Sequence, residues 1–446
     1  MNATSAPTSD PTLAIAPTRR WSLRSLALIV AAWLILQIGG LFSPGLLDDV
    51  DSVYLEVARE MLHRHDFVTP YVNGIRFFDK PPLMYWMASS SMSIFGESDW
   101  AGRLPLALAV LTLLFAVYAL GLRLFAAESP ALHPDLGALY SALAVATGIG
   151  PYLYTRFYIP DILIALWMTL GVHLFLIALD RIAAKRSGLL PCLLFAATLA
   201  LNLLTKGLIG LVFPIGFVFC YLVLTRQLRL LGRMHLLAST AIFAAIALPW
   251  HILAAIRNPA IALPSGLGLP ARGGWAWFYL YNEHFARFLG KRIPHDYGQT
   301  PVWLFWLYAV IWVMPWSAFL PGAITTLRHH LGHRFPSTVR QREAALALTL
   351  WALIVMVFFT LSSRQEYYSI PALPALFLMA GGLLARADSA SPASKSALLW
   401  HRWALLPLAT LVTIVCGWFA ITAPIPPPGP TSPASSPATP TCTTSR

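Results

Sequence analysis

Charged residues are scarce in this sequence. Asp, Glu, Lys and Arg make up only 11% of the 446 residues, apolar residues make up 57%, and the mean hydropathy is +0.65. About a quarter of the residues in an ordinary soluble domain are charged. A chain of this length would ordinarily form two or three soluble domains, but its composition does not match theirs. Apolar runs of about 18–25 residues recur instead, the length that crosses a bilayer core about 30 Å thick. The composition excludes a soluble protein and predicts an all-α polytopic membrane protein.

Cysteine is also rare. Cys192, Cys220 and Cys416 lie in apolar segments and Cys442 lies near the C-terminus, a spacing that matches neither a zinc motif nor a disulfide framework. The net charge is +12, which in a soluble protein could indicate a nucleic-acid partner. However, no lysine-rich tract interleaved with aromatic residues is present, and basic residues in membrane proteins usually mark cytoplasmic loops. We expect no nucleic-acid partner.

Eleven apolar segments are long enough to be candidate membrane spans. They are residues 25–43, 104–122, 136–150, 158–179, 189–204, 207–225, 235–256, 302–327, 344–361, 368–385 and 398–422. No small-residue cleavage signal follows the first span, so we interpret it as a retained helix rather than a signal peptide. The expected organisation is a cytoplasmic segment over 1–24, a membrane domain over 25–422, and a disordered tail over 423–446 that is rich in Pro, Ser and Thr.

The distribution of basic residues predicts the orientation. If the N-terminus lies inside, the inner connections hold 17 Lys/Arg against 6 Asp/Glu, whereas the rest of the chain holds 14 against 13. Cytoplasmic loops carry this excess of basic residues. Two outer connections are then long, at 43–103 and 257–301. Val50, Val53, Val57 and Met61 recur at helical spacing in the first. We expect one helix there and a second in PPLMYWMASSSMSIF, both lying along the membrane surface.

Acidic residues cluster at the start of the first outer connection. Asp48, Asp49 and Asp51 lie within LLDDVDSVYLE, directly before the predicted helix. An aspartate at a helix N-terminus can simply accept backbone N–H groups and suit the helix dipole. Three aspartates in four positions exceed what one cap requires. The alternative is that one of them takes a proton from an attacking hydroxyl at the membrane surface.

Further charges fall on the same predicted side. Asp79 and Lys80 lie side by side in FFDKPPLMYW. Arg156 and Asp161 lie on either side of Pro160 at the start of the fourth span, and Lys206 lies between two apolar runs. Asp161 could serve only as a helix N-terminal charge, and Lys206 could be a lysine that extends to the interface. The sharper alternative for Lys206 is a contact with a phosphate, because an isolated ammonium in so apolar a context requires an anion.

Two later segments complete this set. SSRQEYYSIPALPAL places Arg364, Glu366, Tyr367 and Tyr368 at the outer end of a span, where an interfacial aromatic belt is the simpler explanation. YNEHFARFLGKR contributes Glu283, His284, Arg287, Lys291 and Arg292. A single histidine is more often structural than a metal ligand, and this spacing is not a zinc motif.

Acids and cations from five connections therefore converge on one predicted membrane face. Carboxylates can act as a base, and cations can hold a phosphate leaving group. Lipid-linked phosphates lie at this depth, so the pattern indicates group transfer from a lipid phosphate. The alternative is a transporter or flippase of lipid-linked sugars. Transporters tend to show inverted repeats and charges near the bilayer midplane, neither of which the sequence displays.

Several segments resemble one known family. LLDDVDSVYLEVAREML and TPYVNGIRFFDKPPLMYW, followed in order by LTKGLIGLVFP, NEHFARF and SRQEYYSIPALPAL, resemble the bacterial aminoarabinose transferases and their protein mannosyltransferase relatives over residues 25–385. The resemblance implies a GT-C glycosyltransferase fold with about eleven transmembrane helices and outer juxtamembrane helices. It implies inverting transfer of a sugar from a polyprenyl phosphate to a hydroxyl of a lipid A-like glycolipid, a glycan or a protein, outside the bacterial inner membrane.

The resemblance also implies roles for residues. Asp49 or Asp51 would be the first-loop acid, and Val50 separates them where the family often has adjacent acids. Asp161 would be the second acid, Lys80 would bind the donor phosphate, and Asp79 with His284 would hold a divalent cation, the only cofactor expected. The full expected site comprises catalytic Asp49, Asp51 and Asp161; phosphate-binding Lys80, Arg156, Lys206, Arg287 and Arg364; substrate-binding Tyr54, Tyr85, Tyr367 and Tyr368; and metal-binding Asp79 and His284.

Overall fold

The computed structural model describes residues 21–43, 45–46, 51–126, 134–264, 269–294, 298–332, 337–388 and 392–422. Within these ranges the chain is helical apart from two short antiparallel hairpins and the connecting turns. The chain divides into two compact units, residues 1–398 and 399–446. Most of the predicted cytoplasmic segment and the whole predicted disordered tail fall outside the described residues.

Seven helices are long and apolar enough to cross a membrane within the described part of the chain. They are α1 (Leu23–Phe42), α4 (Asp99–Phe125), α7 (Asp161–Ala183), α8 (Leu189–Lys206), α10 (Leu236–Arg257), α13 (Val339–Leu361), and η4 (Ile370–Ala372) continued by α14 (Leu373–Asp388). The pair formed by α11 (Val302–Val313) and Trp316–Leu331 is bent by 101° and could be an eighth span.

Three shorter apolar helical segments correspond to the predicted spans that remain. They are α5 (Pro134–Thr147), α9 (Ile209–Leu224) and Leu405–Phe419 within α15 (Pro392–Thr422). Each of the eleven predicted spans thus corresponds to a helix or to the bent pair. Further short helices are α6 (Ile149–Tyr154) and η1 (Leu228–Arg233), and the second arm of the bent pair consists of η3 (Trp316–Phe319) and α12 (Leu320–Leu331).

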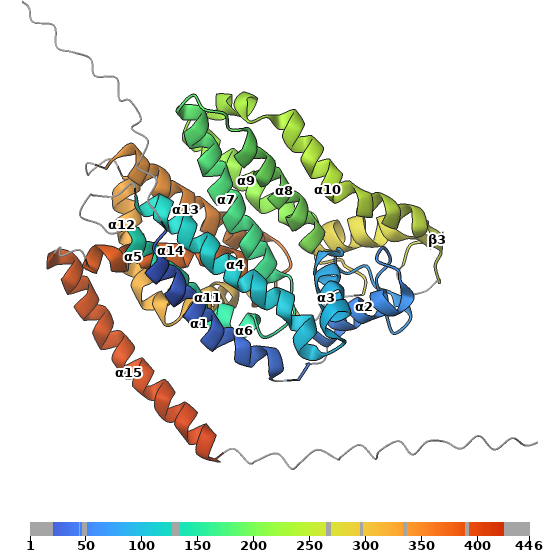
Figure 1. Cartoon of the computed structure of the whole chain (residues 1–446), viewed down its shortest axis with the longest axis horizontal. Helices are drawn as coiled ribbons and strands as arrows, with labels where there is room; N and C mark the ends of the chain where they lie inside the picture. Colours follow the sequence, from blue (N-terminus) through green and yellow to red (C-terminus); the bar gives the residue numbers. More distant parts are fainter. Residues whose placement is uncertain are drawn as a thin grey trace, which may run out of the picture. The chain divides into compact units, whose positions relative to one another are not determined.

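The helices of the first unit pack around α4. This helix contacts α1, α5 and α7, while α14 packs on α5 and α7 packs on α8. Beyond them, α10 packs on α8 and α13 packs on α9, as Figure 1 shows. Because α4 is apolar on every side, it can be buried along most of its length. The centre of the unit is therefore a helix-on-helix core without a sheet among the described residues.

The first long connection folds into two helices and a hairpin. Helix α2 (Asp51–Arg64) and helix α3 (Leu83–Phe95) lie where the sequence predicts helices. Of the residues at helical spacing, Val57 and Met61 are buried, and Leu55 and Ala58 widen the buried face. Between the helices, β1 (Tyr71–Val72) pairs with β2 (Ile75–Arg76). This hairpin was not predicted from the sequence.

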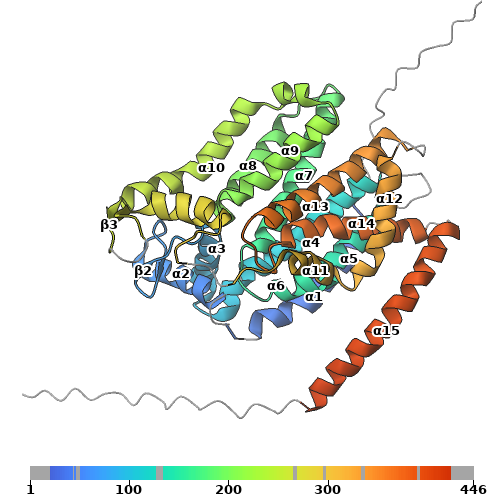
Figure 2. The ribbon, with the colours of Figure 1, turned by 180° about the vertical axis from the view of Figure 1, so that it is seen from behind.

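The second long connection contains structure that the sequence analysis did not assign. Strands β3 (Ile261–Ala262) and β4 (Arg272–Gly273) pair, and an 11-residue π-helix, η2 (Ala276–Ala286), follows. In both views the yellow segment that contains η2 lies between α10 and α2 (Figures 1 and 2). An apolar cluster fixes this position and joins the connection to α8 and α10; its buried members are Phe78, Leu204, Trp250, Ala254, Trp275 and Tyr279.

Candidate active site

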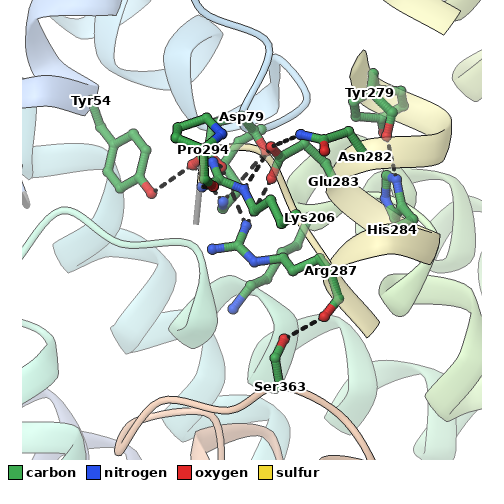
Figure 3. Close-up of polar contacts among 12 residues, drawn as sticks. Tyr54, Asp79, Lys206, Tyr279, Asn282, Glu283, His284, Arg287, Pro294 and Ser363 are labelled. Carbon is green, nitrogen blue, oxygen red and sulfur yellow. Dashed lines mark hydrogen bonds and ion pairs between the residues drawn. The ribbon is translucent and has the colours of Figure 1, made fainter. Parts of the chain in front are cut away.

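Four side chains surround the carboxylate of Asp79, which lies just before α3. Lys80 Nζ is 2.6 Å from Oδ2, and Arg287 Nη1 and Arg292 Nη2 are 3.3 and 3.4 Å from Oδ1. Tyr54 of α2 donates its hydroxyl to Oδ2 at 3.3 Å. Figure 3 shows Tyr54 reaching Asp79 from one side and Arg287 from another. Segments more than 200 residues apart in sequence therefore meet at one carboxylate.

Both arginines also bind a second carboxylate. Glu283 of η2 accepts from Arg287 Nη1 at 2.9 Å and from Arg292 Nε at 2.8 Å. Asn282 supports this arrangement, because its side chain donates to Glu283 at 3.3 Å and exchanges two hydrogen bonds with the backbone of Ile293. Glu283 is almost fully buried, with 2% of its side chain exposed. Each arginine is thus shared between Asp79 and Glu283.

The two carboxyl groups have opposite pKa shifts. Burial alone would raise the pKa of Asp79, but the charges of Lys80, Arg287 and Arg292 outweigh it and hold the pKa well below its usual range. Burial, together with the neighbouring charge of Asp79, raises the pKa of Glu283 to about 7. Asp79 therefore stays ionised at neutral pH, whereas Glu283 is close to its titration point. Paired carboxyls with diverging pKa values are common at functional sites.

A buried ion pair lies beside this group. Lys206, the last residue of α8, places Nζ 2.7 and 2.8 Å from the two oxygens of Asp161, the first residue of α7. Nζ also lies 4.2 Å from the ring centre of Tyr368 and 5.7 Å from that of Tyr367. A cation over an aromatic face is stabilised by the ring quadrupole. The predicted members Asp161, Lys206, Tyr367 and Tyr368 are thus brought together.

The combined cluster carries an excess of positive charge. Figure 3 shows Lys206 in the same cluster as Asp79, Glu283 and Arg287. Lys80, Lys206, Arg287 and Arg292 supply four cations against the three carboxylates of Asp79, Asp161 and Glu283. With every group ionised, the sum is one positive charge. One monovalent anion would neutralise it.

The turn after Lys206 is built around His284. The backbone N–H of Leu208 donates to His284 Nε2 at 2.9 Å, and Nδ1 lies 2.6 Å from the carbonyl oxygen of Tyr279. Gly207 has φ +78°, and a Cβ there would lie 2.0 Å from His284 Nε2. Glycine is therefore needed at position 207 for two reasons. It adopts the positive φ, and it leaves room for the His284 ring, which a Cβ would displace.

The residues do not fit the divalent cation that the resemblance implies. An N–H group can only donate, so Nε2 of His284 accepts and Nδ1 carries the proton that it donates to Tyr279. Neither nitrogen retains a lone pair for a metal. Asp79 is likewise surrounded by four donors. No group of three His, Cys, Asp or Glu side chains suited to a metal occurs among the described residues. The prediction of Asp79 and His284 as a metal pair is not supported by this donor set.

Of the two predicted first-loop acids, the structure describes only Asp51, which pairs with a different cation. Asp49 lies outside the described residues. Asp51 is fully buried at the start of α2, and Arg103 of α4 approaches its carboxylate to 2.6 Å. Asp51 lies one helical turn before Tyr54, so α2 connects this ion pair to the Asp79 group. Arg103 was not predicted to be its partner.

Two predicted phosphate-binding arginines have other partners. Arg156 donates to the carbonyl of Leu36 on α1 and lies 4.3 Å from the ring centre of Tyr152. Arg364 binds four backbone carbonyl groups, which belong to Thr300, Phe359, Thr360 and Ser362. Among the described contacts, none joins either arginine to Asp79 or Asp161. Arg156 tethers α1, and Arg364 caps the end of α13.

One predicted substrate-binding residue has an unpaired hydroxyl. Tyr85 of α3 is fully buried, and its OH has no hydrogen-bond partner among the described residues. Its ring centre lies 6.2 Å from that of Tyr54. Burial and the nearby carboxylates of Asp79 and Glu283 raise the pKa of Tyr85, which keeps the phenol protonated. Burying a polar group without a partner is unfavourable, so this hydroxyl marks a place for a ligand or a water molecule.

A cavity of about 460 Å³ lies next to α2. Ser52, Glu56 and Arg59 line it from α2, and Glu97 and Asp99 line it from the α3–α4 junction. At 100° per residue, these α2 positions face away from Tyr54. The cavity and the charged cluster therefore lie on opposite sides of this helix.

Sequence reasoning did not include Glu283, Arg292, Asn282 or Arg103 among the site residues. Glu283 and Arg287 are four positions apart, a spacing at which helical side chains meet, and this was the available signal. The contact of Arg292 with Asp79 spans 213 residues and has no local signature. The same holds for Arg103 and Asp51.

Comparison with known proteins identifies the family. The family model described as "Dolichyl-phosphate-mannose-protein mannosyltransferase" matches residues 21–263, which is more than half of the chain. The chain belongs to the PMT family. The resemblance inferred from the sequence motifs is thereby confirmed.

Relatives of this PMT-family chain share its sequence and fold. A Pseudomonas aeruginosa protein named undecaprenyl phosphate-alpha-4-amino-4-deoxy-L-arabinose arabinosyl transferase is 28% identical over 367 residues, covering 82% of this chain and 59% of that protein. The crystal structure of ArnT from Cupriavidus metallidurans bound to undecaprenyl phosphate matches with a TM-score of 0.68 and 25% identity, covering 89% of this chain and 64% of that one.

A third comparison supports the fold alone. The apo oligosaccharyltransferase of Archaeoglobus fulgidus matches with a TM-score of 0.53 and 15% identity, covering 83% of this chain and 51% of that one. The predicted GT-C membrane fold is confirmed, and the protein is a multi-pass membrane protein. The chain spans about three-fifths of the length of the arabinosyl transferase relative.

Proposed function

We propose that this protein transfers a sugar from a polyprenyl phosphate to an acceptor hydroxyl at the outer face of the bacterial inner membrane, with its N-terminus in the cytoplasm. The observation that carries the proposal is the excess positive charge of the cluster formed by Lys80, Lys206, Arg287 and Arg292 with three carboxylates. A sugar–phosphate–lipid diester carries one negative charge and balances it. The unequal distribution of basic residues supports the orientation.

In this proposal the four cations bind the donor phosphate. As the bond between the anomeric carbon and the phosphate oxygen breaks, the electron pair passes to that oxygen and the phosphate gains a second negative charge. Cations that are already in place stabilise this developing charge without reorganisation. Lys80, Lys206 and Arg287 keep their expected roles and Arg292 joins them. Arg156 and Arg364 are left out, because their guanidinium groups bind backbone carbonyls elsewhere.

The acceptor hydroxyl requires a base on the opposite face of the sugar. We assign the role of the base to Asp49 or Asp51 of the first outer connection. Asp161 has a different role, which is to position Lys206. The base takes the hydroxyl proton while the acceptor oxygen attacks the anomeric carbon, so the configuration inverts. Tyr54, Tyr85, Tyr367 and Tyr368 would contact the sugar and phosphate, and the unpaired hydroxyl of Tyr85 is the strongest support for this part.

The test is a transfer assay with purified protein in lipid nanodiscs. The names of the relatives supply the first donor to try, undecaprenyl phosphate-α-4-amino-4-deoxy-L-arabinose, beside other radiolabelled polyprenyl-phosphate sugars, with membrane extract as acceptor. Wild-type protein should pass label to an acceptor, and the product identifies both the sugar and the acceptor as lipid, glycan or protein. Lys80→Ala should lower the rate at least about 100-fold, the size of effect seen when one group that stabilises developing charge is removed.

Lys291→Ala is the matched control, because Lys291 is an exposed lysine of the same connection as Arg287. It should retain wild-type activity. Asp49→Asn and Asp51→Asn identify the base, since only the variant of the true base should lose transfer while keeping affinity for the donor. A fully active Lys80→Ala would remove Lys80 from the site. With the same protein in sealed proteoliposomes, labelled lipid that crosses the bilayer with no donor consumed would overturn the enzyme proposal in favour of a transporter.

A further inference from the structure

His284 lies at the junction between η2 and the end of α8. Its two ring nitrogens bridge the carbonyl of Tyr279, five residues earlier in η2, and the N–H of Leu208, 76 residues away in sequence. The ring also packs edge-on against Tyr279 at 4.9 Å between ring centres. The imidazole is thus held on three sides by neighbours from two elements.

We propose that His284 is a positioning residue and not a metal ligand: its neutral imidazole holds the Gly207–Leu208 turn and thereby aims Lys206 at the donor phosphate. This inference rests on the proposed function, because Lys206 must bind that phosphate. It explains the role of His284 without the divalent cation that the sequence resemblance implies.

The protonation state follows from the hydrogen bonds. Since Nε2 accepts from Leu208, the proton must be on Nδ1, and a second proton on Nε2 would break this bond. Burial lowers the pKa of His284 to about 4, and the charges of Lys80 and Arg287 act in the same direction although the carbonyl of Tyr279 opposes them. The neutral tautomer with a proton on Nδ1 is therefore the form present at neutral pH.

The connection to Lys206 is direct along the backbone. Lys206 ends α8, Gly207 follows with its positive φ, and Leu208 carries the N–H that His284 binds. A displacement of this turn would move the Cα of Lys206 and withdraw Nζ from Asp161 and from the face of Tyr368. The absence of a Cβ at Gly207 is what allows the ring to reach the turn.

Two substitutions separate a hydrogen-bonding role from a metal-binding role. The side-chain oxygen of glutamine reaches the position of Nε2, so His284→Gln keeps an acceptor for Leu208. The amide of asparagine reaches only the position of Nδ1, so His284→Asn keeps the bond to Tyr279 and loses the one to Leu208. We expect His284→Gln to bind undecaprenyl phosphate within about threefold of wild type and His284→Asn to bind about tenfold more weakly, the effect of one lost hydrogen bond.

The measurement is the Kd for undecaprenyl phosphate in nanodiscs, with and without EDTA or added Zn²⁺, alongside the melting temperature of each variant. Wild-type affinity should not change with chelator. Equal losses in both variants, combined with wild-type affinity that falls in EDTA and returns with Zn²⁺, would establish a metal ligand and overturn the proposal. Unchanged affinity in both variants would also overturn it.

A double-mutant cycle with Lys206→Met distinguishes positioning from general stability. If His284 acts through Lys206, Lys206→Met combined with His284→Asn should bind no more weakly than Lys206→Met alone. A lower melting temperature with additive losses in Kd would show a purely structural role. If wild-type protein does not bind undecaprenyl phosphate at all, the proposed function itself fails. If it binds and the cycle is additive, only the role of His284 is lost.

Discussion

Glu283 is the residue at which the charge balance of the site can change at physiological pH. Its carboxylate binds Arg287 and Arg292, and both arginines also reach Asp79. When Glu283 is protonated, the two arginines lose one of their anionic partners while Asp79 remains ionised. The positive charge available to a phosphate then increases.

The raised pKa of Glu283 predicts a pH-dependent stability. A carboxyl group with a pKa of about 7 in the folded protein and about 4.5 when unfolded binds its proton more tightly in the folded state. Its contribution to stability therefore rises as the pH falls through 7 and is lost above it. Between pH 8 and pH 6 the change should be on the order of 1 kcal/mol.

The measurement is the melting temperature of wild type and Glu283→Gln at pH 8, 7 and 6. Wild type should gain stability relative to Glu283→Gln as the pH falls. The difference between the two proteins is the relevant quantity, because buried His284 has a lowered pKa and acts in the opposite direction below pH 6.5. Glu56→Gln, at the cavity on the far side of α2, is the control and should follow wild type. Parallel curves for wild type and Glu283→Gln would contradict the prediction.

At the scale of elements, Arg364 shows how one guanidinium can terminate a helix. The last carbonyl groups of a helix have no partner within it, and Arg364 binds those of Phe359, Thr360 and Ser362 at the end of α13. It also ties this end to Thr300, which precedes α11. A cation at a helix C-terminus is favoured by the helix dipole as well.

We therefore expect Arg364→Ala to affect stability and not phosphate binding. The substitution should lower the melting temperature, since several carbonyls lose a charged donor worth about 1.5–3 kcal/mol. The Kd of the remaining folded protein for undecaprenyl phosphate should stay within about twofold of wild type. Arg76→Ala, which removes an exposed arginine from β2, should change neither quantity. A tenfold loss of affinity in Arg364→Ala would return this arginine to the phosphate site.

The membrane spans can be predicted from the sequence, whereas the hairpin and the π-helix were not. Long apolar runs identify the spans because a helix across a bilayer must be apolar over its length. The β1–β2 hairpin was missed although Asn73 and Gly74 both have positive φ, the usual property of an Asn-Gly turn. The π-helix η2 has no comparable signal. Its i→i+5 hydrogen bonds have no local sequence pattern, and its packing against α10 joins residues that are distant in sequence.

For the site as well, local sequence patterns predict some features, and others depend on contacts between distant segments. The sequence predicts that Lys80, Asp161, Lys206 and Arg287 lie on one side of the membrane, because charge at span ends and the count of basic residues are local properties. It does not show which cation meets which carboxylate. Arg156 and Arg364 look equivalent to Arg287 in sequence, yet both bind backbone carbonyls, Arg364 at the end of α13 and Arg156 at Leu36 within α1. Only the packing of helices separates these cases.

At the scale of the whole molecule, the proposed orientation predicts which residues are accessible from each side. Ser93 on α3 and Ser187 between α7 and α8 are both exposed. In a variant whose native cysteines are replaced by alanine, Ser93→Cys should react with a membrane-impermeant maleimide in intact spheroplasts. Ser187→Cys should react only after the membrane is opened. The reverse pattern would place the charged cluster in the cytoplasm and contradict the proposed site of transfer.

The ion pairs of the site also imply an order of assembly during synthesis. Asp161 and Lys206 are 45 residues apart and lie on consecutive helices, α7 and α8. These two helices can enter the membrane as a hairpin with their charges already paired, so neither charge crosses the lipid alone. Asp79 has Lys80 as a neighbour from the start, but Arg287 is made 208 residues later. The donor site can therefore form only after η2 has emerged from the ribosome, and a chain interrupted before that point would carry Asp79 without the two arginines that bind it.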